Sequence, residues 1–265
     1  MVATTQIIFM VMAGLASVLL PFVFILILRR RFKIRWIPIL IGAAIFILFA
    51  MVLEQISHFL VLKPAMDGTI SLLEESPWLY VLYGVLAAGI FEETGRLTAF
   101  LMMKRKYKRM DSAVSYGIGH GGIEAIIVLG LGMLNSVVFS IMINNGSSAV
   151  DNLPPALIES IAGTSSFTYI LSIVERIFAI TVHIGLSIIV FTSVMKKGKW
   201  WLFPAAIVLH ALTNVTAAMM QAGLLENMWL MYAGLMIMTV IIGWIAYKLV
   251  VQDGRLDSNQ HDASF

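Results

Sequence analysis

The chain has 265 residues, of which 60% are hydrophobic and 12% are charged, with a formal net charge of +3. A soluble domain of this size carries roughly a quarter charged residues, so this composition indicates an integral membrane protein. The chain contains no cysteine, which excludes a disulfide framework and thiol chemistry. We expect no nucleic-acid partner. The lysines and arginines gather in the connections between the apolar segments, so the topology of a membrane protein explains the small positive charge.

Apolar stretches of about 20 residues recur along the chain, the length that a helix needs to cross the hydrocarbon core of a bilayer. We expect an all-α, polytopic membrane helix bundle of about seven transmembrane helices, forming a single integral-membrane domain over residues 1–251. Residues 252–265 are polar and are expected to be a disordered cytoplasmic tail. The turn-rich loop at 144–167 has room for a short interfacial helix at 156–162. The expected spans are 5–28, 36–62, 78–103, 113–143, 168–195, 200–221 and 228–249.

Lysine and arginine are concentrated in every second connection between these spans. Basic runs at 29–35, 104–109 and 196–199 follow the first, third and fifth spans. The alternate connections carry Lys63 and no other basic residue. By the positive-inside rule, this pattern predicts an external amino terminus and a cytoplasmic carboxyl terminus. The first span lacks a basic n-region and a small-residue cleavage site, so we do not expect a cleaved signal peptide.

Ionisable side chains lie within the expected spans, where each costs about 3 kcal/mol or more at the bilayer centre. The default interpretation of such a residue is therefore functional. Histidines together with carboxylates favour a metal site or a hydrolytic centre. The candidate groups are Glu92-Glu93-x-x-Arg96, His120-x-x-x-Glu124, His183 and His210-x-x-x-Asn214.

The distance of each group from its nearest basic run places the groups at one level of the membrane. A helix rises about 1.5 Å per residue, so Glu92 lies roughly 18 Å from Lys104. The same arithmetic places the three histidines at roughly 16–20 Å from their own basic runs. The second residue of each His-x-x-x pair lies one turn further in, on the same helix face. Four helices therefore present polar groups near mid-membrane.

Other ionisable residues within the spans are expected at a different depth from these groups. Glu175 lies roughly 31 Å from Lys196, near the expected external face. Glu54 and His58 are displaced to the same side, so His58 is not expected to be a metal ligand. Glu175 and its neighbour Arg176 are expected either to form an external polar clamp or to snorkel to the interface.

Two or three histidines with a carboxylate can hold zinc and leave one coordination position for water. A nearby glutamate then takes the proton of that water, and Glu92 or Glu93 is the candidate general base. Arg96 can pair with either glutamate, and Asn214 can donate to a developing oxyanion. The arrangement is that of a metal hydrolase. The predicted metal ligands are His120, Glu124, His183 and His210.

Glycine crowds the sequence around His120, at positions 117, 119, 121 and 122. Glycine lets a neighbouring helix, a ligand or a substrate chain approach the backbone closely. The alternative to a ligand-binding role is plain packing of small residues between helices.

The chain also carries Tyr116 four residues before His120, and Arg176 seven residues before His183. In their order, these motifs resemble those of the YhfC family of intramembrane metalloproteases, and the chain is similar to the wider superfamily of CAAX prenyl endopeptidases and PrsW-type proteases. The paired glutamates with a trailing arginine resemble the PrsW pattern. Tyr116-x-x-x-His120 resembles the Phe-x-x-x-His motif of the CAAX group, and the final His-x-x-x-Asn matches its last motif. The resemblance covers residues 78–221.

The resemblance implies a zinc-dependent intramembrane endopeptidase in a bacterial-type plasma membrane. Its catalytic core would be residues 78–221, and its substrate a peptide or a membrane-protein segment. Two alternatives stay open: a catalytically inactive scaffold or immunity-type binding protein, and a proton-coupled transporter. The chain shows no clear internal repeat and few prolines within its spans, and both features weigh against a transporter. The sequence predicts neither the particular substrate nor the oligomeric state.

Overall fold

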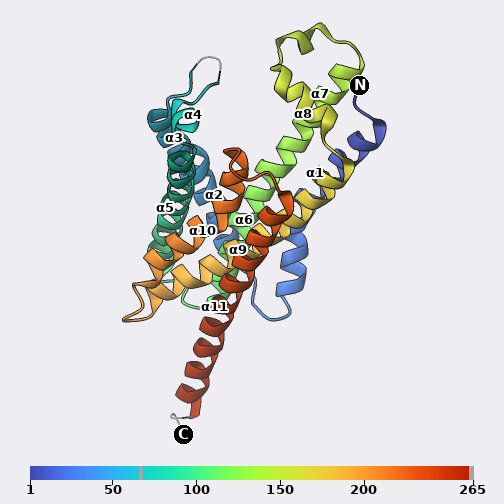
Figure 1. The fold of residues 1–265 in the computed structure, drawn as a ribbon. Helices are drawn as coiled ribbons and strands as arrows, with labels where there is room; N and C mark the ends of the chain where they lie inside the picture. The colour runs from blue at the N-terminus through green and yellow to red at the C-terminus, as the bar shows by residue number, and fades with distance from the viewer. Residues whose placement is uncertain (66–67, 263–265) are drawn as a thin grey trace.

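The computed structural model describes residues 1–65 and 68–262, and within them the chain is a bundle of helices without a strand (Figure 1). Among the described residues, six stretches are long and apolar enough to cross a membrane, which confirms a polytopic, all-α membrane protein. These stretches bring the chain into contact with the lipid bilayer. They are Thr4–Leu28, Trp36–Leu62, Met110–Asn144, Ser166–Met195, Leu202–Gln221 and Met228–Gly254.

Two of the membrane-length stretches are interrupted by π-helical segments, labelled η1 and η2, which the sequence analysis does not predict. π-Helical turns are rare and occur frequently at functional sites. The elements are α1 (Thr4–Leu28), α2 (Trp36–Phe46), η1 (Ile47–Glu54), α3 (Gln55–Leu62), α4 (Ser71–Glu75), α5 (Pro77–Met103), α6 (Met110–Ala125), η2 (Ile126–Leu131), α7 (Gly132–Asn144), η3 (Ser148–Asn152), α8 (Pro155–Gly163), α9 (Ser166–Met195), α10 (Leu202–Gln221) and α11 (Met228–Asp262).

The third expected span forms α5, but α5 is not among the six apolar stretches. Its Glu92, Glu93 and Arg96 lower its hydropathy, and all three side chains are buried inside the bundle. A helix can keep such residues in a membrane when they face protein rather than lipid. The number of seven spans stays a prediction for this reason.

The three basic connections lie at one end of the bundle together with the carboxyl terminus, and the amino terminus lies at the other end (Figure 1). The amino terminus is fixed there by Asn144 at the end of α7, whose side chain exchanges two hydrogen bonds with the Val2 backbone. This arrangement agrees with the charge pattern, although the orientation of the termini across a bilayer stays a prediction.

The sequence analysis predicts a short helix at 156–162 and a disordered tail at 252–265. The short helix expected at 156–162 is α8, although its position at an interface is untested. The last helix, α11, continues to Asp262, into the segment 252–265 that the sequence predicts to be disordered. Residues 263–265 lie outside the described residues, and the division into a membrane domain and a tail stays a prediction.

The centre of the bundle is built on α6 and α9. α6 packs against α2 on one side and α9 on another, and α5 packs against α10. The largest cluster of buried apolar residues in the described part of the chain joins α5, α6 and α9, and the Phe100 ring contacts the rings of both Tyr116 and Phe191. This cluster fixes the three helices that carry most of the polar groups.

The glycines of α6 serve helix packing. A Cβ atom at Gly119 would collide with the carbonyl oxygen of Ile39 on α2, and one at Gly117 would collide with the Ile184 backbone on α9. Gly121 also faces α9, and Gly122 faces Pro21 on α1. Only glycine permits this approach of backbone to backbone, so of the two interpretations of this run the structure supports close packing of helices. The packing also fixes His120, which lies in the middle of the run.

Replacing Gly119 with alanine should destabilise the protein, because the added methyl group meets rigid backbone. Overpacking of this kind costs about 1–3 kcal/mol. Gly132 is the matched control on the same membrane-length stretch, since a Cβ atom there meets nothing within 4 Å. We expect Gly119→Ala to lower the thermal unfolding midpoint in detergent and Gly132→Ala to leave it unchanged or slightly raised. Equal midpoints for the two variants would contradict this account of α6.

Candidate metal centre

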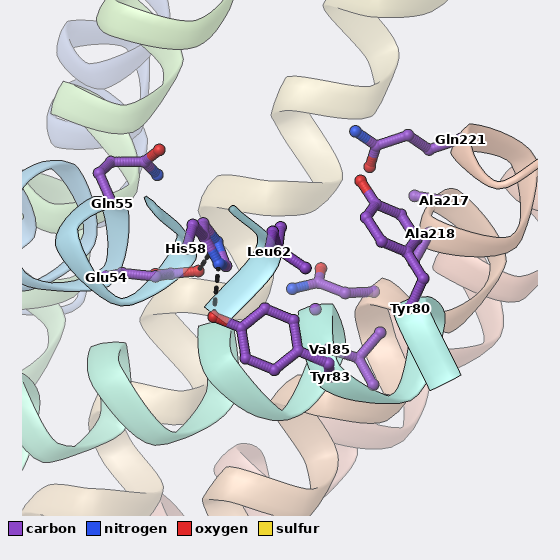
Figure 2. Close-up of a pocket in the computed structure, with 12 residues that line it drawn as sticks. Glu54, Gln55, His58, Leu62, Tyr80, Tyr83, Val85, Ala217, Ala218 and Gln221 are labelled. Carbon is purple, nitrogen blue, oxygen red and sulfur yellow. Dashed lines mark hydrogen bonds and ion pairs between the residues drawn. The ribbon is translucent and has the colours of Figure 1, made fainter. Parts of the chain in front are cut away.

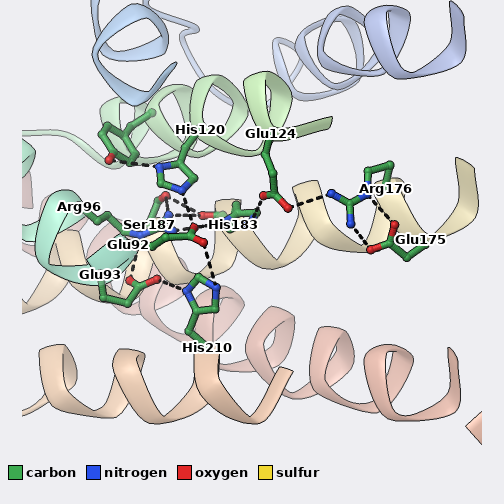
Figure 3. Close-up of polar contacts among 11 residues, drawn as sticks. Glu92, Glu93, Arg96, His120, Glu124, Glu175, Arg176, His183, Ser187 and His210 are labelled. Atoms are coloured by element: carbon green, nitrogen blue, oxygen red, sulfur yellow. Dashed lines mark hydrogen bonds and ion pairs between the residues drawn. The ribbon is translucent and has the colours of Figure 1, made fainter. Parts of the chain in front are cut away.

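Four helices bring their polar groups together at the middle of the bundle (Figure 3). α5 supplies two carboxylates and an arginine, α6 a histidine and a carboxylate, and α9 and α10 one histidine each. The structure therefore brings together the residues that the depth argument selected. The exception is Asn214, which makes no hydrogen bond or ion pair with the others. The assembled residues are Glu92, Glu93, Arg96, His120, Glu124, His183 and His210.

Glu92 lies among three imidazole rings. Its Oε2 atom is 2.9 Å from His120 Nε2 and 3.9 Å from His183 Nδ1, while its Oε1 atom is 3.8 Å from His210 Nε2. The ring centroid of His183 lies 4.9 Å from that of His120 and 5.5 Å from that of His210. The Glu92 carboxylate thus faces histidines from three different helices.

The donor set fits a transition-metal ion. Ligand atoms of Glu92, His120 and His183 all lie within 4.8 Å of one another, and all three residues are buried. Imidazole nitrogens and carboxylate oxygens are the ligands that zinc takes in catalytic sites. His210 Nε2, which also faces Glu92, is a further candidate ligand. The chemistry of these residues supports a metal site without identifying the metal.

Glu93 and Arg96 form a buried ion pair beside this group. Neither side chain is exposed, and Arg96 Nε lies 2.9 Å from Glu93 Oε2. The other Glu93 oxygen accepts a hydrogen bond from His210 Nδ1 at 2.7 Å. A carboxylate on one ring nitrogen of a metal-binding histidine orients the ring and leaves the other nitrogen free. Glu93 therefore directs His210 Nε2 toward Glu92.

Arg96 also fixes the tautomer of His183. It donates through Nη1 to the backbone carbonyl of His183 at 2.8 Å and to the Ser187 hydroxyl. Its Nη2 atom lies 3.1 Å from His183 Nδ1, and because a guanidinium can only donate, Nδ1 is the acceptor there. The ring proton of His183 then sits on Nε2, which pairs with Glu124. An ion bound to Nδ1 would have to displace the Arg96 contact.

Glu124 belongs to a chain of charges that leads away from the centre along α9. It pairs with His183 Nε2 on one side and with Arg176 Nη1, at 2.8 Å, on the other. Arg176 in turn pairs with Glu175. Arg176 is buried and paired on both sides, which supports a polar clamp that reaches the centre through Glu124. In this position Glu124 orients His183, and its predicted role as a direct ligand stays a prediction.

Asn214 makes no hydrogen bond within the described part of the chain, although it faces the centre. It is half-buried and lines a cavity of about 60 Å³ together with Glu92, Glu124, His183 and His210. Its free amide can therefore meet a molecule that enters this cavity, which agrees with the oxyanion role expected from the sequence but does not test it.

Ser187 is a site residue that the sequence analysis missed. Its hydroxyl accepts from Arg96 and donates to the His183 carbonyl one turn earlier on α9. The spacing of four residues from His183 is the available signal, but serine at that spacing is common on any helix. Tyr116 was selected only by resemblance, and its hydroxyl lies 3.4 Å from His120 Nδ1.

Comparison with known proteins shows similarity to a protein family and to a curated relative. The model of a family described as YhfC intramembrane metalloprotease matches residues 16–236, which include every residue of the centre. A relative described as "Uncharacterized membrane protein YhfC", from Bacillus subtilis (strain 168), is 33% identical over 234 residues, covering 86% of this chain and 90% of the relative. No solved structure matches the chain.

Loss of Arg96 should destabilise the protein strongly, because it leaves the Glu93 carboxylate buried without a partner. Breaking a buried pair in this way costs about 3–5 kcal/mol. We expect Arg96→Met to lower the unfolding midpoint in detergent, and the double variant Glu93→Gln with Arg96→Met to recover part of the loss. Arg109→Met is the matched control, since Arg109 pairs with Asp111 but its side chain is 70% exposed. A loss no larger than that of the control would show that the buried pair is not a structural requirement.

Proposed function

We propose a catalytic function from one premise: the chain belongs to the YhfC intramembrane metalloprotease family. The protein is a zinc-dependent intramembrane endopeptidase that hydrolyses a peptide bond with a glutamate-activated water. The observation that carries this proposal is the convergence of His120, His183 and His210 on the Glu92 carboxylate at the middle of the bundle. Its substrate is a peptide or a segment of a membrane protein.

Glu92, and not Glu93, is the general base in this proposal. Glu93 is fully buried and already holds Arg96 and His210, so both of its oxygens are engaged. Glu92 lines the cavity of about 60 Å³ together with His183 and His210. This volume exceeds the roughly 10–15 Å³ that a single water needs. Glu92 can therefore accept a proton from a water in the cavity and pass it to the departing amine.

The three histidines would hold the metal, His120 and His210 through Nε2 and His183 through Nδ1. When bound, zinc supplies polarisation of the scissile carbonyl and activation of the attacking water. Glu93 orients the His210 ring toward the centre, and Glu124 orients the His183 ring in the same way. Carboxylates in these positions fix ring orientation and raise metal affinity.

The remaining side chains handle the charge that develops during hydrolysis. Asn214 carries an unengaged amide on the cavity wall, where it can donate to the oxyanion of the tetrahedral intermediate. Arg96 contacts the His183 backbone carbonyl, Ser187 and Glu93 rather than the cavity, so it is a positioning residue. Burial of the whole centre strengthens each of these electrostatic contacts relative to water.

The roles of Glu92 and Asn214 can be separated by substitution in the full chain. A proteome-derived peptide mixture, with mass spectrometry of the products, supplies substrates and relative rates. We expect Glu92→Gln to lower cleavage by about 10²–10⁴-fold, the range for losing a general base. Asn214→Ala should lower it by roughly 10²–10³-fold, as the loss of one oxyanion donor does.

Both variants should keep the metal content of the unmodified protein, because neither change removes a histidine. Glu159→Gln, at an exposed position of α8, is the control and should leave the rate unchanged. Full cleavage by Glu92→Gln would contradict the mechanism. A zinc-loaded, folded protein that cleaves no peptide would instead favour the scaffold or binding protein.

A further inference from the structure

A second and larger cavity lies outside the candidate metal centre, with a volume of about 440 Å³ (Figure 2). Its walls come from the end of η1 and from α3, α5 and α10. Small residues on the facing helices leave the space open, among them Gly84, Ala217 and Ala218. Of the helices that line it, α3 lies beside α4 at the end of the bundle opposite the basic connections (Figure 1).

One wall of this cavity carries an ionisable cluster that the catalytic proposal does not use. Glu54 is buried, and its Oε1 atom lies 3.3 Å from His58 Nε2 one turn later. The His58 Nδ1 atom lies 3.1 Å from the Tyr83 hydroxyl on α5, which also contacts Ser57. A carboxylate held within a membrane-spanning stretch has a functional interpretation by default. The π-helical segment η1 ends at Glu54, which agrees with this interpretation.

The two cavities share one residue. Asn214 lines the large cavity together with Val85 and Ala217, and it lines the small cavity together with Glu92 and His210. A molecule in the large cavity therefore lies against the same amide that faces the metal centre. The large cavity is placed to hold the part of a substrate that adjoins the bond undergoing hydrolysis.

The polar lining of the cavity suits a peptide in extended conformation. A peptide segment unwound within a membrane exposes backbone N–H and C=O groups that must find partners in the protein. The cavity offers amides and hydroxyls that both donate and accept, and its volume falls in the range of ligand pockets, about 300–1,000 Å³. These groups are Gln55, Tyr80, Tyr83, Asn214 and Gln221.

The charge of the lining favours a cationic group. Glu54 is the one carboxylate among the described residues that line the cavity, and none of them is a lysine or an arginine. His58 contributes a positive charge only when it is protonated. A carboxylate in a partly dehydrated wall attracts a cation much more strongly than it would in water.

We propose that the large cavity is the substrate cleft of the enzyme, and that Glu54 selects a peptide segment with a lysine or arginine side chain. This inference rests on the proposed endopeptidase function and adds its substrate class. The segment enters from the α4 end of the bundle, lies unwound between α3, α5 and α10, and presents its next peptide bond to Asn214 and Glu92.

The natural chain has no cysteine, so a single Ala217→Cys substitution reports on this cavity alone. The probes are two thiosulfonates of similar size, one with a cationic trimethylammonium-ethyl group and one with an anionic sulfonato-ethyl group. Ser148→Cys, exposed in η3, corrects for their intrinsic reactivities. The corrected rates should favour the cationic reagent by about tenfold, the ratio that a difference of about 1.4 kcal/mol produces.

Glu54→Gln should remove this preference and leave the Ser148→Cys rates unchanged. Gly84→Leu should slow both reagents, because a Cβ atom at Gly84 meets nothing within 4 Å and a larger side chain can fill the space. No charge preference, or a preference that survives Glu54→Gln, would overturn the inference.

Peptide binding is measured by protection of Ala217→Cys, which requires no cleavage. The probes are an alanine–leucine peptide with one central lysine and the same peptide with glutamine in its place. The lysine peptide should slow modification several-fold more than the glutamine peptide, and Glu54→Gln should abolish the difference. Equal protection, or none, would overturn the inference.

Protection by the lysine peptide in a chain whose cleavage survives Glu92→Gln would remove the catalytic mechanism but retain the peptide cleft. Loss of cleavage in Glu92→Gln without any peptide protection would retain the catalytic mechanism but remove the peptide cleft. The two proposals therefore fail separately.

Discussion

A single buried arginine ties together three of the helices that form the centre. Arg96 extends from α5 to the backbone and side chains of α9, and its partner Glu93 holds His210 on α10. Two unhydrated charges are costly in a membrane interior, and a close ion pair with further hydrogen bonds offsets much of that cost. The pair fixes the rotation of α5 about its axis, and the contacts of Glu92 with the three histidines depend on that rotation.

Adjacent residues on a helix point about 100° apart, so paired glutamates cannot share one environment. Once Glu93 turns toward Arg96, Glu92 must turn toward the histidines, and the two carboxylates acquire different surroundings. Glu93 is enclosed, and both of its oxygens are paired, whereas Glu92 borders a cavity. This division gives one residue the task of holding the centre together and leaves its neighbour available for proton transfer.

Helix arithmetic from the sequence predicted the level of the polar groups, because rise per residue and the basic loops fix depth. It did not predict the rotation of each helix, so it left Glu92 and Glu93 equivalent. The Arg96 contact with His183 joins α5 to α9 across the bundle, and no local pattern reveals it. The π-helical segment before Glu54 alters the helical period, so the cavity beside His58 was not expected from spacing.

The central claim is that three imidazole rings on three helices hold one metal ion beside Glu92. X-ray absorption at the zinc edge, on full-length protein purified without added metal, tests it most directly. The account predicts about one zinc per chain, with two or three imidazole nitrogens at about 2.0–2.1 Å and oxygen in the remaining positions. A spectrum of oxygen ligands alone, or folded protein free of any transition metal, would contradict the account.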